Sequence, residues 1–379
     1  MVERDDMKKA ADIIKSSHAP LIVLPKNPSA DALAAATLIL GRLRKDGKAA
    51  TVHGEKTAPI GWEFLPLSTL NKPNGLTGET RILIDTRQSP VGGLRYEKTE
   101  NLLSVILTPK DKSILPSAVR IVSADSTGEN ITTADCIVAL GVRTADELAL
   151  RFPETPQIVF ETPVINIDTG AANEEWGEAN LTDIEALSLT EISWQFTKTL
   201  SGEPMSKDEA ELILAGILWR NIGIIPANSS SEKLHLIAES KESGANDTAM
   251  FKAISREHTE KTERIAGRML ARKRFEPAKN ISFLMLTPVD FAATASTEGD
   301  VLSAFWFLTR KFALGDAAVL LWQKDSSGEI RSFALAKNRE LNKELRVALG
   351  GKFLGDILSG GKSFSSFKEA EEFILSCIK

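Results

Sequence analysis

Short runs of consecutive apolar residues constrain the fold of this chain most, because each is too short for an ordinary helix and too apolar for an exposed strand. They occur at residues 20–27, 80–86, 136–142 and 162–169, and stretches with helical periodicity lie among them. Continuous apolar strands are typical of parallel sheets that helices cover on both faces. The alternation of strands and helices therefore predicts an α/β fold with an open, mainly parallel sheet.

N-capping residues in the sequence predict where the helices begin. Residues 30–46 predict a helix with Asn27 or Ser29 as its N-cap. From residue 181 to 224 the pattern is helical, and Ser188 followed by Glu191 predicts a capping box. Residues 95–109 predict an antiparallel addition to the sheet.

Connectors rich in Ser, Asn and Gly at residues 226–234 and 241–247 mark a domain boundary. A basic stretch at 251–275 predicts one long helix, exposed and stabilised by pairs of opposite charge, with a nucleic-acid groove as the alternative. The expected organisation is an α/β domain at 1–225, a connector with a linker helix at 226–275, and a smaller α/β domain at 276–379.

Composition excludes several classes of protein. A net charge of −5 and a pI near 5.7 give no overall attraction to nucleic acid or an anionic membrane. No uncharged apolar run approaches the roughly 18–20 residues that cross a bilayer, so a cytoplasmic protein is expected. The chain has four histidines, and none follows a strand at a strand-to-helix turn. Chemistry that needs several clustered histidines is therefore not expected.

Two segments contain residues in the order and spacing of a known pair of motifs. The first has the frame N-P-x-x-D-A, and the second begins where an apolar strand ends in a carboxylate. The letters are Asn27-Pro28 with Asp31-Ala32, then Ile167-Asp168, Asn173, Trp176-Gly177, Asn180 and Ser188-Leu189-Thr190-Glu191. Over nearly the whole chain this order resembles the DHH-family phosphoesterases, named for an Asp-His-His motif, which include bacterial nano-RNases and related nucleotide phosphodiesterases.

The resemblance implies a DHH-type N-terminal domain with a mainly parallel sheet, a helical linker and a smaller C-terminal α/β domain. It also implies a two-metal reaction, in which divalent ions, usually Mn²⁺, about 3.5–4 Å apart activate water and hold the phosphate. Such ions need imidazole and carboxylate ligands. At the family's ligand positions this chain keeps the carboxylates of Asp31 and Asp168. The degenerate positions are Pro25, Ser29, Gly141, Thr169, Gly170 and Arg220.

No metal cofactor is therefore expected. Arg220 stands where the family has a metal-binding aspartate, and a fixed cation repels metal ions. We hypothesise that Arg220 pairs with Asp31 or Asp168 instead. Asp31 can also stabilise the first turn of its own helix, and Asp168 can order the turn after its strand; each remains a candidate for a residual polar pocket.

The C-terminal domain of the family binds substrate with an S-L-R-S strand and a GGGH loop. Here residues 332–335 read SFAL, with alanine at the arginine position, and residues 350–352 read GGK without the histidine. Lys352 beside two glycines can contact an anion or simply be a solvated loop lysine. The resemblance implies these substrate-binding candidates: Asn27, Asn173, Gly350, Gly351 and Lys352.

The sequence predicts a catalytically inactive relative that binds a nucleotide, a short single-stranded nucleic acid or a protein partner in an interdomain cleft. The main alternative is an active phosphodiesterase in which Asp31, Asp85, Asp168 and Glu191 hold one Mg²⁺. A second alternative is a scaffold or oligomerisation module without ligand. Homodimerisation is left open, and Asp85 is interpreted as a turn residue at a strand end.

Overall fold

The computed structural model describes residues 2–59, 61–71, 80–84, 90–99, 103–111, 113, 119–123, 134–226, 229–256, 259–325 and 328–378. The chain forms two compact units, one of Met1–Leu70 with Ala134–Lys379 and one of Asn71–Thr133. Asp85 lies outside the described residues. All other predicted site residues belong to the larger unit.

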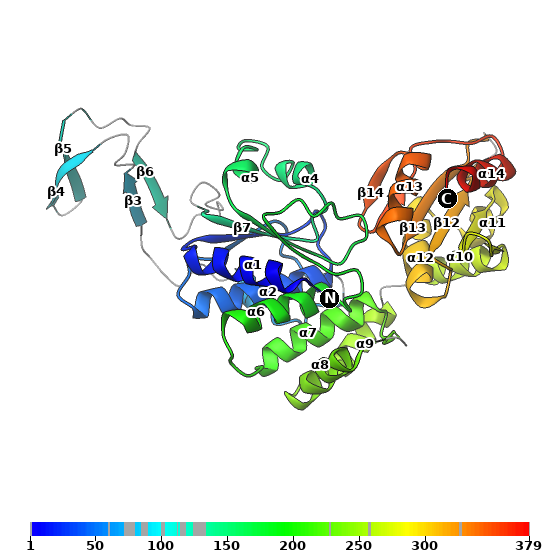
Figure 1. Ribbon diagram of the computed structural model, residues 1–379, viewed down its shortest axis with the longest axis horizontal. Coiled ribbons are helices and arrows are strands. Elements are labelled where there is room, and N and C mark those ends of the chain that lie inside the picture. Colours follow the sequence, from blue (N-terminus) through cyan, green and yellow to red (C-terminus); the bar gives the residue numbers. More distant parts are fainter. Residues whose placement is uncertain are drawn as a thin grey trace. The chain divides into compact units, whose positions relative to one another are not determined.

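The larger unit contains a sheet of five strands, all parallel to their neighbours (Figure 1). Their bounds are β1 Pro20–Val23, β2 Thr51–His53, β7 Cys136–Leu140, β8 Val164–Asp168 and β9 Ala179–Thr182. The order across the sheet is β2-β1-β7-β8-β9. Every residue of β1, β7 and β8 is buried. The predicted α/β fold with a mainly parallel sheet is confirmed.

Helices cover both faces of this sheet, as Figure 1 shows. On one side lie α1 (Arg4–Ser16), α2 (Ala30–Lys45), α6 (Leu189–Leu200) and α7 (Lys207–Arg220). On the other lie α4 (Ala145–Ala149) and α5 (Ile158–Glu161), while α3 (Ser68–Asn71) is a single turn. Because α2 is apolar nearly all round, it is buried between the sheet and its neighbours α6 and α7. This packing fixes the start of α2 beside the start of α6.

The smaller unit corrects one expectation. Residues 80–86 were expected to form a strand of the parallel sheet. Instead β3 (Thr80–Ile84) pairs antiparallel with β6 (Val119–Ser123) in a two-stranded sheet. The expected antiparallel segment is present as β4 (Val91–Lys98) and β5 (Leu103–Pro109), but as a separate two-stranded sheet. An apolar run alone does not say which sheet a strand joins.

The linker at 226–275 contains more helices than the sequence predicted. Its helices are α8 (Ser231–Glu242), α9 (Asp247–Arg256) and α10 (Glu260–Ala271). The expectation of one helix over 251–275 is therefore wrong. A new helix starts at α10 because the Thr259 side chain accepts a hydrogen bond from the amide of Thr262, which is an N-cap. Two basic residues of α10 form ion pairs, Arg264 with Glu260 and Arg268 with Asp290.

The C-terminal part is a six-stranded sheet in the order β10-β11-β12-β13-β15-β14. The strands are β10 Arg274–Glu276, β11 Ile281–Leu286, β12 Ala317–Trp322, β13 Arg331–Ala336, β14 Lys352–Leu354 and β15 Ile357–Ser359. Only β11 and β12 are parallel. Successive residues of β11 point to opposite faces, so Phe283 joins one hydrophobic core and Leu284 joins the other.

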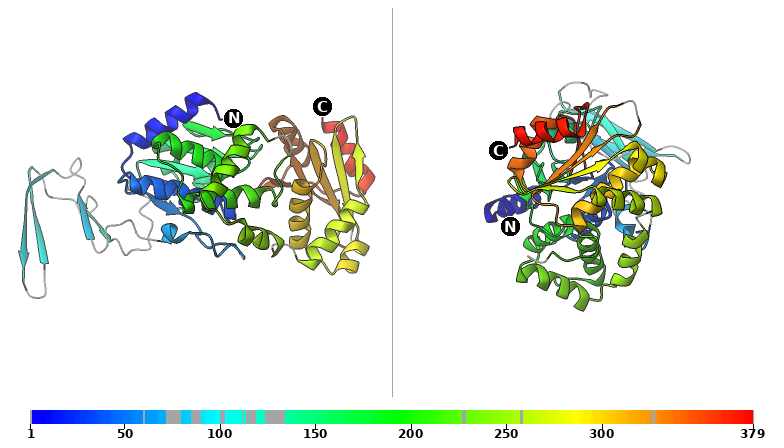
Figure 2. Two further views of the ribbon diagram at one scale, coloured as in Figure 1. Left: turned by 90° about the horizontal axis from the view of Figure 1, so that it is seen from below. Right: turned by 90° about the vertical axis from the view of Figure 1, so that its right-hand side faces the viewer.

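Helices on the two faces complete these two cores. They are α11 Pro288–Thr294, α12 Glu298–Lys311, α13 Arg339–Leu349 and α14 Phe367–Cys377. In the right-hand view of Figure 2, α13 and α14 (orange and red) lie on one side of the sheet and the yellow α10 to α12 on the other. None of the helices in the described part of the chain combines the length and apolar character that crossing a bilayer requires.

Candidate functional site

The site lies where strands β1, β7 and β8 end. Because these strands are parallel, their carboxyl ends share one edge of the sheet, the edge at which open α/β sheets bind ligands. The segments that follow the strands contain Pro25 and Ser29, then Gly141, then Thr169 and Gly170. Gly141 has a φ of 61°, a backbone conformation that favours glycine. Nearly all the positions at which this chain lacks a metal ligand of the DHH-type motifs therefore lie at this edge of the sheet.

Asp31 is the first carboxylate of the site, and it is 1% exposed. Its Oδ2 accepts a hydrogen bond from the Leu189 amide at 2.9 Å, and its Oδ1 accepts one from the Thr190 amide at 3.1 Å. Leu189 and Thr190 open α6, so Asp31 binds the N-terminus of a helix other than its own. Ser29 caps the helix that carries Asp31, accepting from the Ala32 amide at 3.1 Å.

A glycine on α7 makes room for this contact. An ideal Cβ built on Gly216 would lie 2.2 Å from Thr190 Oγ1 and 2.5 Å from Asp31 Oδ1. Both distances are far below van der Waals contact, so a side chain cannot be accommodated without displacing the carboxylate. Gly216 is thus required by the packing of α7 against the start of α6.

Asp168 ends β8 and is 5% exposed. Its Oδ1 accepts from the amides of Thr169 at 2.7 Å and Gly170 at 3.0 Å. Its Oδ2 accepts from the Asn173 side-chain amide at 2.8 Å. As with Asp31, both oxygens of this carboxylate are engaged by N–H groups of the protein, and Asp168 orders the turn that follows the strand.

Asn173 and Asn180 of the second motif form one polar network with Asn166, in which Asn166 and Asn173 are buried. Asn166 donates to Asn173 Oδ1 at 2.8 Å and to Asn180 Oδ1 at 3.2 Å. Asn173 also donates to the Val142 carbonyl at 3.1 Å, and Asn180 accepts from the Gly177 amide at 2.9 Å. These asparagines satisfy buried backbone groups around the loop after β8.

The helix that carries Ser188 and Glu191 is capped differently from the prediction. Ser188 Oγ accepts from the Glu191 amide at 3.0 Å, as expected for an N-cap. The Glu191 carboxylate instead accepts from the Leu187 amide at 2.6 Å and from the Gln195 side chain at 3.3 Å. Glu191 reaches one residue beyond the N-cap, so its reciprocal bond is not the one a capping box makes.

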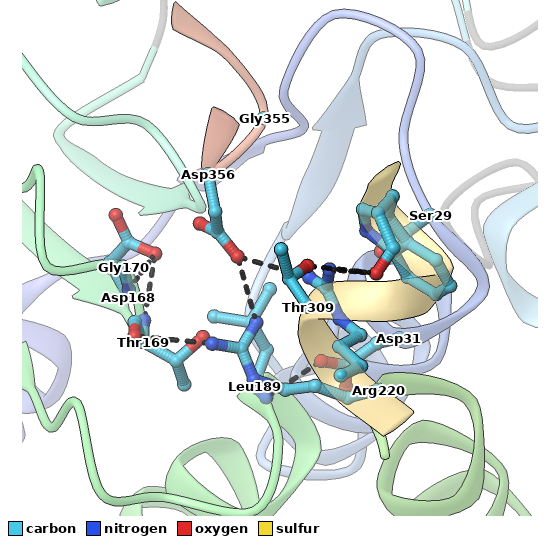
Figure 3. A network of polar contacts seen from close by, with 12 residues as sticks. Ser29, Asp31, Asp168, Thr169, Gly170, Leu189, Arg220, Thr309, Gly355 and Asp356 are labelled. Atoms are coloured by element: carbon cyan, nitrogen blue, oxygen red, sulfur yellow. Dashed lines mark hydrogen bonds and ion pairs between the residues drawn. The ribbon is translucent and has the colours of Figure 1, made fainter. Parts of the chain in front are cut away.

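Arg220, the last residue of α7, reaches the same edge of the sheet (Figure 3). Its guanidinium donates to the Thr169 carbonyl at 3.2 Å and lies 3.5 Å from Asp356 Oδ2. We hypothesised a pair with Asp31 or Asp168; the ion pair found within 4 Å is with Asp356 instead. The charge of Arg220 still acts on Asp31, whose pKa it lowers against a larger effect of burial.

Asp356 belongs to the turn between β14 and β15, where Gly355 has a φ of 59°. Its Oδ2 also accepts from Arg310 of α12 at 3.2 Å, and the Arg310 guanidinium lies 3.9 Å from the Trp306 ring centre. A third guanidinium, that of Arg143 after β7, donates to the Gly355 carbonyl. Figure 3 shows Asp356 pointing at Arg220 from the turn. Three arginines, one from α7, one from α12 and one from the segment after β7, therefore contact this turn.

The buried carboxylates of this edge differ in their pKa. Burial raises the pKa of Asp168, and the neighbouring charge of Asp356 raises it further, while the Asn173 side chain opposes the shift. Burial likewise raises the pKa of Asp31, with the Leu189 amide opposing. Burial alone would also raise the pKa of Asp356, but its arginine neighbours outweigh this and lower it. Of the three, Asp356 has the strongest preference for the charged form.

These residues do not fit a two-metal centre. Among the described residues, no group of three or more His, Cys, Asp or Glu is placed to hold a metal ion. The oxygens of Asp31 and Asp168 already accept hydrogen bonds from the protein. At Gly170, the family's second histidine position, an ideal Cβ would lie 3.0 Å from Asp356 Oδ1, so a side chain there would require Asp356 to shift by a few tenths of an ångström.

The predicted substrate-binding residues lie in two environments. Asn27 is exposed with a φ of 56°, and Gly351 and Lys352 are exposed at the start of β14. Gly350 ends α13 with a φ of 62°. Asn173 is buried, and its amide bonds to the protein. Their roles in binding remain predictions.

Sequence reasoning missed Asp356, Arg310 and Arg143. The Gly355-Asp356 pair between two short strands was a turn signal, but a turn signal does not say what the turn meets. Arg310 and Arg143 stand near the end of a helix and after a strand, where charged residues are common. Only the tertiary arrangement brings these three residues together.

No family model and no curated protein sequence matches the chain. Among solved structures, an exopolyphosphatase-related protein from Bacteroides fragilis matches with a TM-score of 0.61 and 16% identity, over 100% of this chain and 96% of that one. RecJ from Thermus thermophilus in complex with Mn²⁺ matches with a TM-score of 0.42 and 8% identity, over 99% of this chain and 55% of that one. The first match shows that the two proteins share a fold over the whole of this chain.

The packing at Gly216 is testable by adding one methyl group. Gly216→Ala should lower the free energy of unfolding by about 1–3 kcal/mol, because the Cβ would overlap Thr190 and Asp31. Gly267→Ala in α10 is the matched control, since nothing lies within 4 Å of its ideal Cβ. That control should raise the free energy of unfolding by about 0.5–1 kcal/mol through helix propensity. Equal effects of both substitutions in urea unfolding would refute this account of Gly216.

The lowered pKa of Asp356 predicts a pH-dependent contribution to stability. Its stabilisation should be present above the ordinary Asp pKa of about 3.9 and lost as the pH falls through the lower pKa of the folded state. Near neutral pH, Asp356→Asn should lower the free energy of unfolding by about 1–3 kcal/mol. Towards low pH the difference from the wild type should vanish, because a protonated Asp resembles Asn.

Urea unfolding at a series of pH values measures this difference. Asp12→Asn, at an exposed position of α1, is the control and should change the free energy of unfolding by less than about 0.5 kcal/mol. A stability difference for Asp356→Asn that stays constant with pH would argue against the ion pairs.

Proposed function

We propose that this chain is a non-hydrolytic protein with a DHH-type phosphoesterase fold, which binds a nucleotide or a short single-stranded oligonucleotide without cleaving it. The observation that carries the proposal is the guanidinium of Arg220, which stands at a motif aspartate position and is held by Thr169 and Asp356. A cation at this place supports binding of an anion and opposes binding of a metal ion.

The charge of Arg220 would repel a metal ion at this place strongly. At an effective dielectric constant of about 20, two unit charges about 4 Å apart interact by about 4 kcal/mol, and a divalent ion would double that repulsion. The retained carboxylates offer little compensation, because each accepts N–H groups of the protein and burial raises the pKa of both. Asp31 and Asp168 then serve as acceptors that hold a helix start and a turn, and hydrolysis through bound metal has no ligand set to support it.

The surroundings of Arg220 support a ligand that carries phosphate. Arg143 and Arg310 reach the same turn, and exposed Lys352 follows the pair Gly350-Gly351. Guanidinium groups bind phosphate oxygens through paired, charge-assisted hydrogen bonds. The description of the structural neighbour as exopolyphosphatase-related points to the same class of ligand.

The test compares cleavage with binding on the same ligand. A 5′-phosphorylated RNA dinucleotide incubated with the purified protein and Mn²⁺ or Mg²⁺ should stay intact, as followed by chromatography. The same dinucleotide titrated into the protein without metal should give a saturable calorimetric signal. That signal should weaken as salt rises, because phosphate contacts by basic side chains are screened.

Two results would overturn the proposal. Metal-dependent turnover that Asp31→Asn or Asp168→Asn abolishes would show a working phosphodiesterase with a rearranged site. Absence of both cleavage and binding would instead favour a scaffold without ligand.

A further inference from the structure

We propose that Asp356 occupies, as an internal ligand, a phosphate-binding site formed by Arg143, Arg220 and Arg310. The inference rests on the proposed function, because it assumes a ligand that carries phosphate. It adds which side chains hold that phosphate and which group of the protein competes with it.

The first support is that arginines from separate parts of the chain reach the same turn. Arg220 ends α7 of the parallel-sheet part, Arg310 lies on α12 of the C-terminal part, and both reach the same oxygen of Asp356, at 3.5 and 3.2 Å. Trp219, next to Arg220, and Trp306, one helical turn before Arg310, bring these two helices into contact, with ring centres 5.1 Å apart and the rings tilted at 48°. Arg143 donates to the carbonyl of the adjoining Gly355, 5.3 Å from the Phe353 ring centre. The three guanidinium groups thus face one small region.

The second support is the charge balance of this region. Asp356 is the carboxylate within 4 Å of both Arg220 and Arg310, the more distant charge of Asp31 also acts on both arginines, and Arg143 has a separate partner in Glu147 at 3.0 Å. The nearby Asp168 accepts three N–H groups of the protein, and no ion pair of Asp168 with Arg220 or Arg310 within 4 Å is found among the described residues. The Arg220 and Arg310 side chains are 20% and 13% exposed, so water screens their repulsion only in part. A phosphate group, with more oxygens and more charge than a carboxylate, would satisfy these arginines better than Asp356 does.

The third support is the position of Asp356 on its element. It lies on the turn of the β14–β15 hairpin, two strands of three residues each, at the edge of the C-terminal sheet. Gly350, Gly351 and Gly355 all have a positive φ, and the glycine pair precedes the hairpin. Only Phe333 and Ala334 of β13 pair with β15 in the register of the sheet. A short hairpin with few ladder contacts, flanked by glycines, is well placed to withdraw its carboxylate.

Internal occupancy has a measurable consequence. A site that its own carboxylate fills binds an external anion more weakly, in proportion to the fraction of molecules in which the site is empty. Removing the carboxylate while keeping its volume should therefore strengthen phosphate binding. Removing a different carboxylate at the junction between the parallel-sheet part and the C-terminal part should leave phosphate binding unchanged.

The experiment is calorimetric titration of the full-length protein with inorganic phosphate at low ionic strength. Asp356→Asn should bind phosphate at least about tenfold more tightly than the wild type. Glu174→Gln is the matched control, because Glu174 forms an ion pair with Arg346, at 2.9 Å, between the same two parts of the larger unit. That variant loosens the junction without emptying the site and should bind phosphate as the wild type does.

A second variant identifies the arginines. Adding Arg310→Gln to Asp356→Asn should remove the gain in affinity, and circular dichroism checks that each variant is folded. If Asp356→Asn fails to fold, Asp356→Ser provides the same comparison.

The outcomes separate this inference from the proposed function. Equal phosphate affinity of the wild type and Asp356→Asn, with the RNA dinucleotide still bound, would overturn the internal ligand and leave the binding function intact. A gain equally large in Glu174→Gln would show that junction opening, and not the vacated carboxylate position, controls affinity. Failure of every variant to bind either phosphate or the dinucleotide would overturn both proposals.

Discussion

The ion pairs of Asp356 with Arg220 and Arg310 are the interaction on which the arrangement of the site depends. They join the end of α7 to α12 and to the β14–β15 turn, and so connect the carboxyl edge of the parallel sheet to the C-terminal sheet. Partly buried cations are stable only when an anion compensates them. An internal carboxylate provides that compensation in a fold whose catalytic relatives are expected to use carboxylates to hold metal ions.

The motif residues that this chain retains make hydrogen bonds or packing contacts that stabilise the fold. Asp31 holds the start of α6, and Asp168 holds the turn after β8. Asn173 and Asn180 close the buried network around that turn, and Gly216 leaves space for Asp31. The positions that lack the family's letters are those that would supply imidazole or carboxylate to a metal. These retained motif residues therefore have structural roles.

Much of the fold was predictable, because burial on both faces makes the strands of a parallel sheet continuously apolar. The strand at 80–86 was misplaced since an apolar run does not specify its partner, and the helix at 251–275 was drawn too long because the N-cap at Thr259 was overlooked. Asp31 and Asp168 were predictable from motif order. Asp356 and Arg310 were not, because they lie far apart in the sequence and only packing brings them together.

The central claim is that a guanidinium has taken the place of a metal ion, and direct measurement of Mn²⁺ binding tests it most simply. Electron paramagnetic resonance distinguishes free aqueous Mn²⁺ from bound Mn²⁺ without any substrate. The account predicts that the wild-type protein leaves the signal of free Mn²⁺ unchanged at equimolar concentration. Loss of that signal in the wild type, and its return in Asp31→Asn or Asp168→Asn, would show a metal centre at this edge and contradict the account.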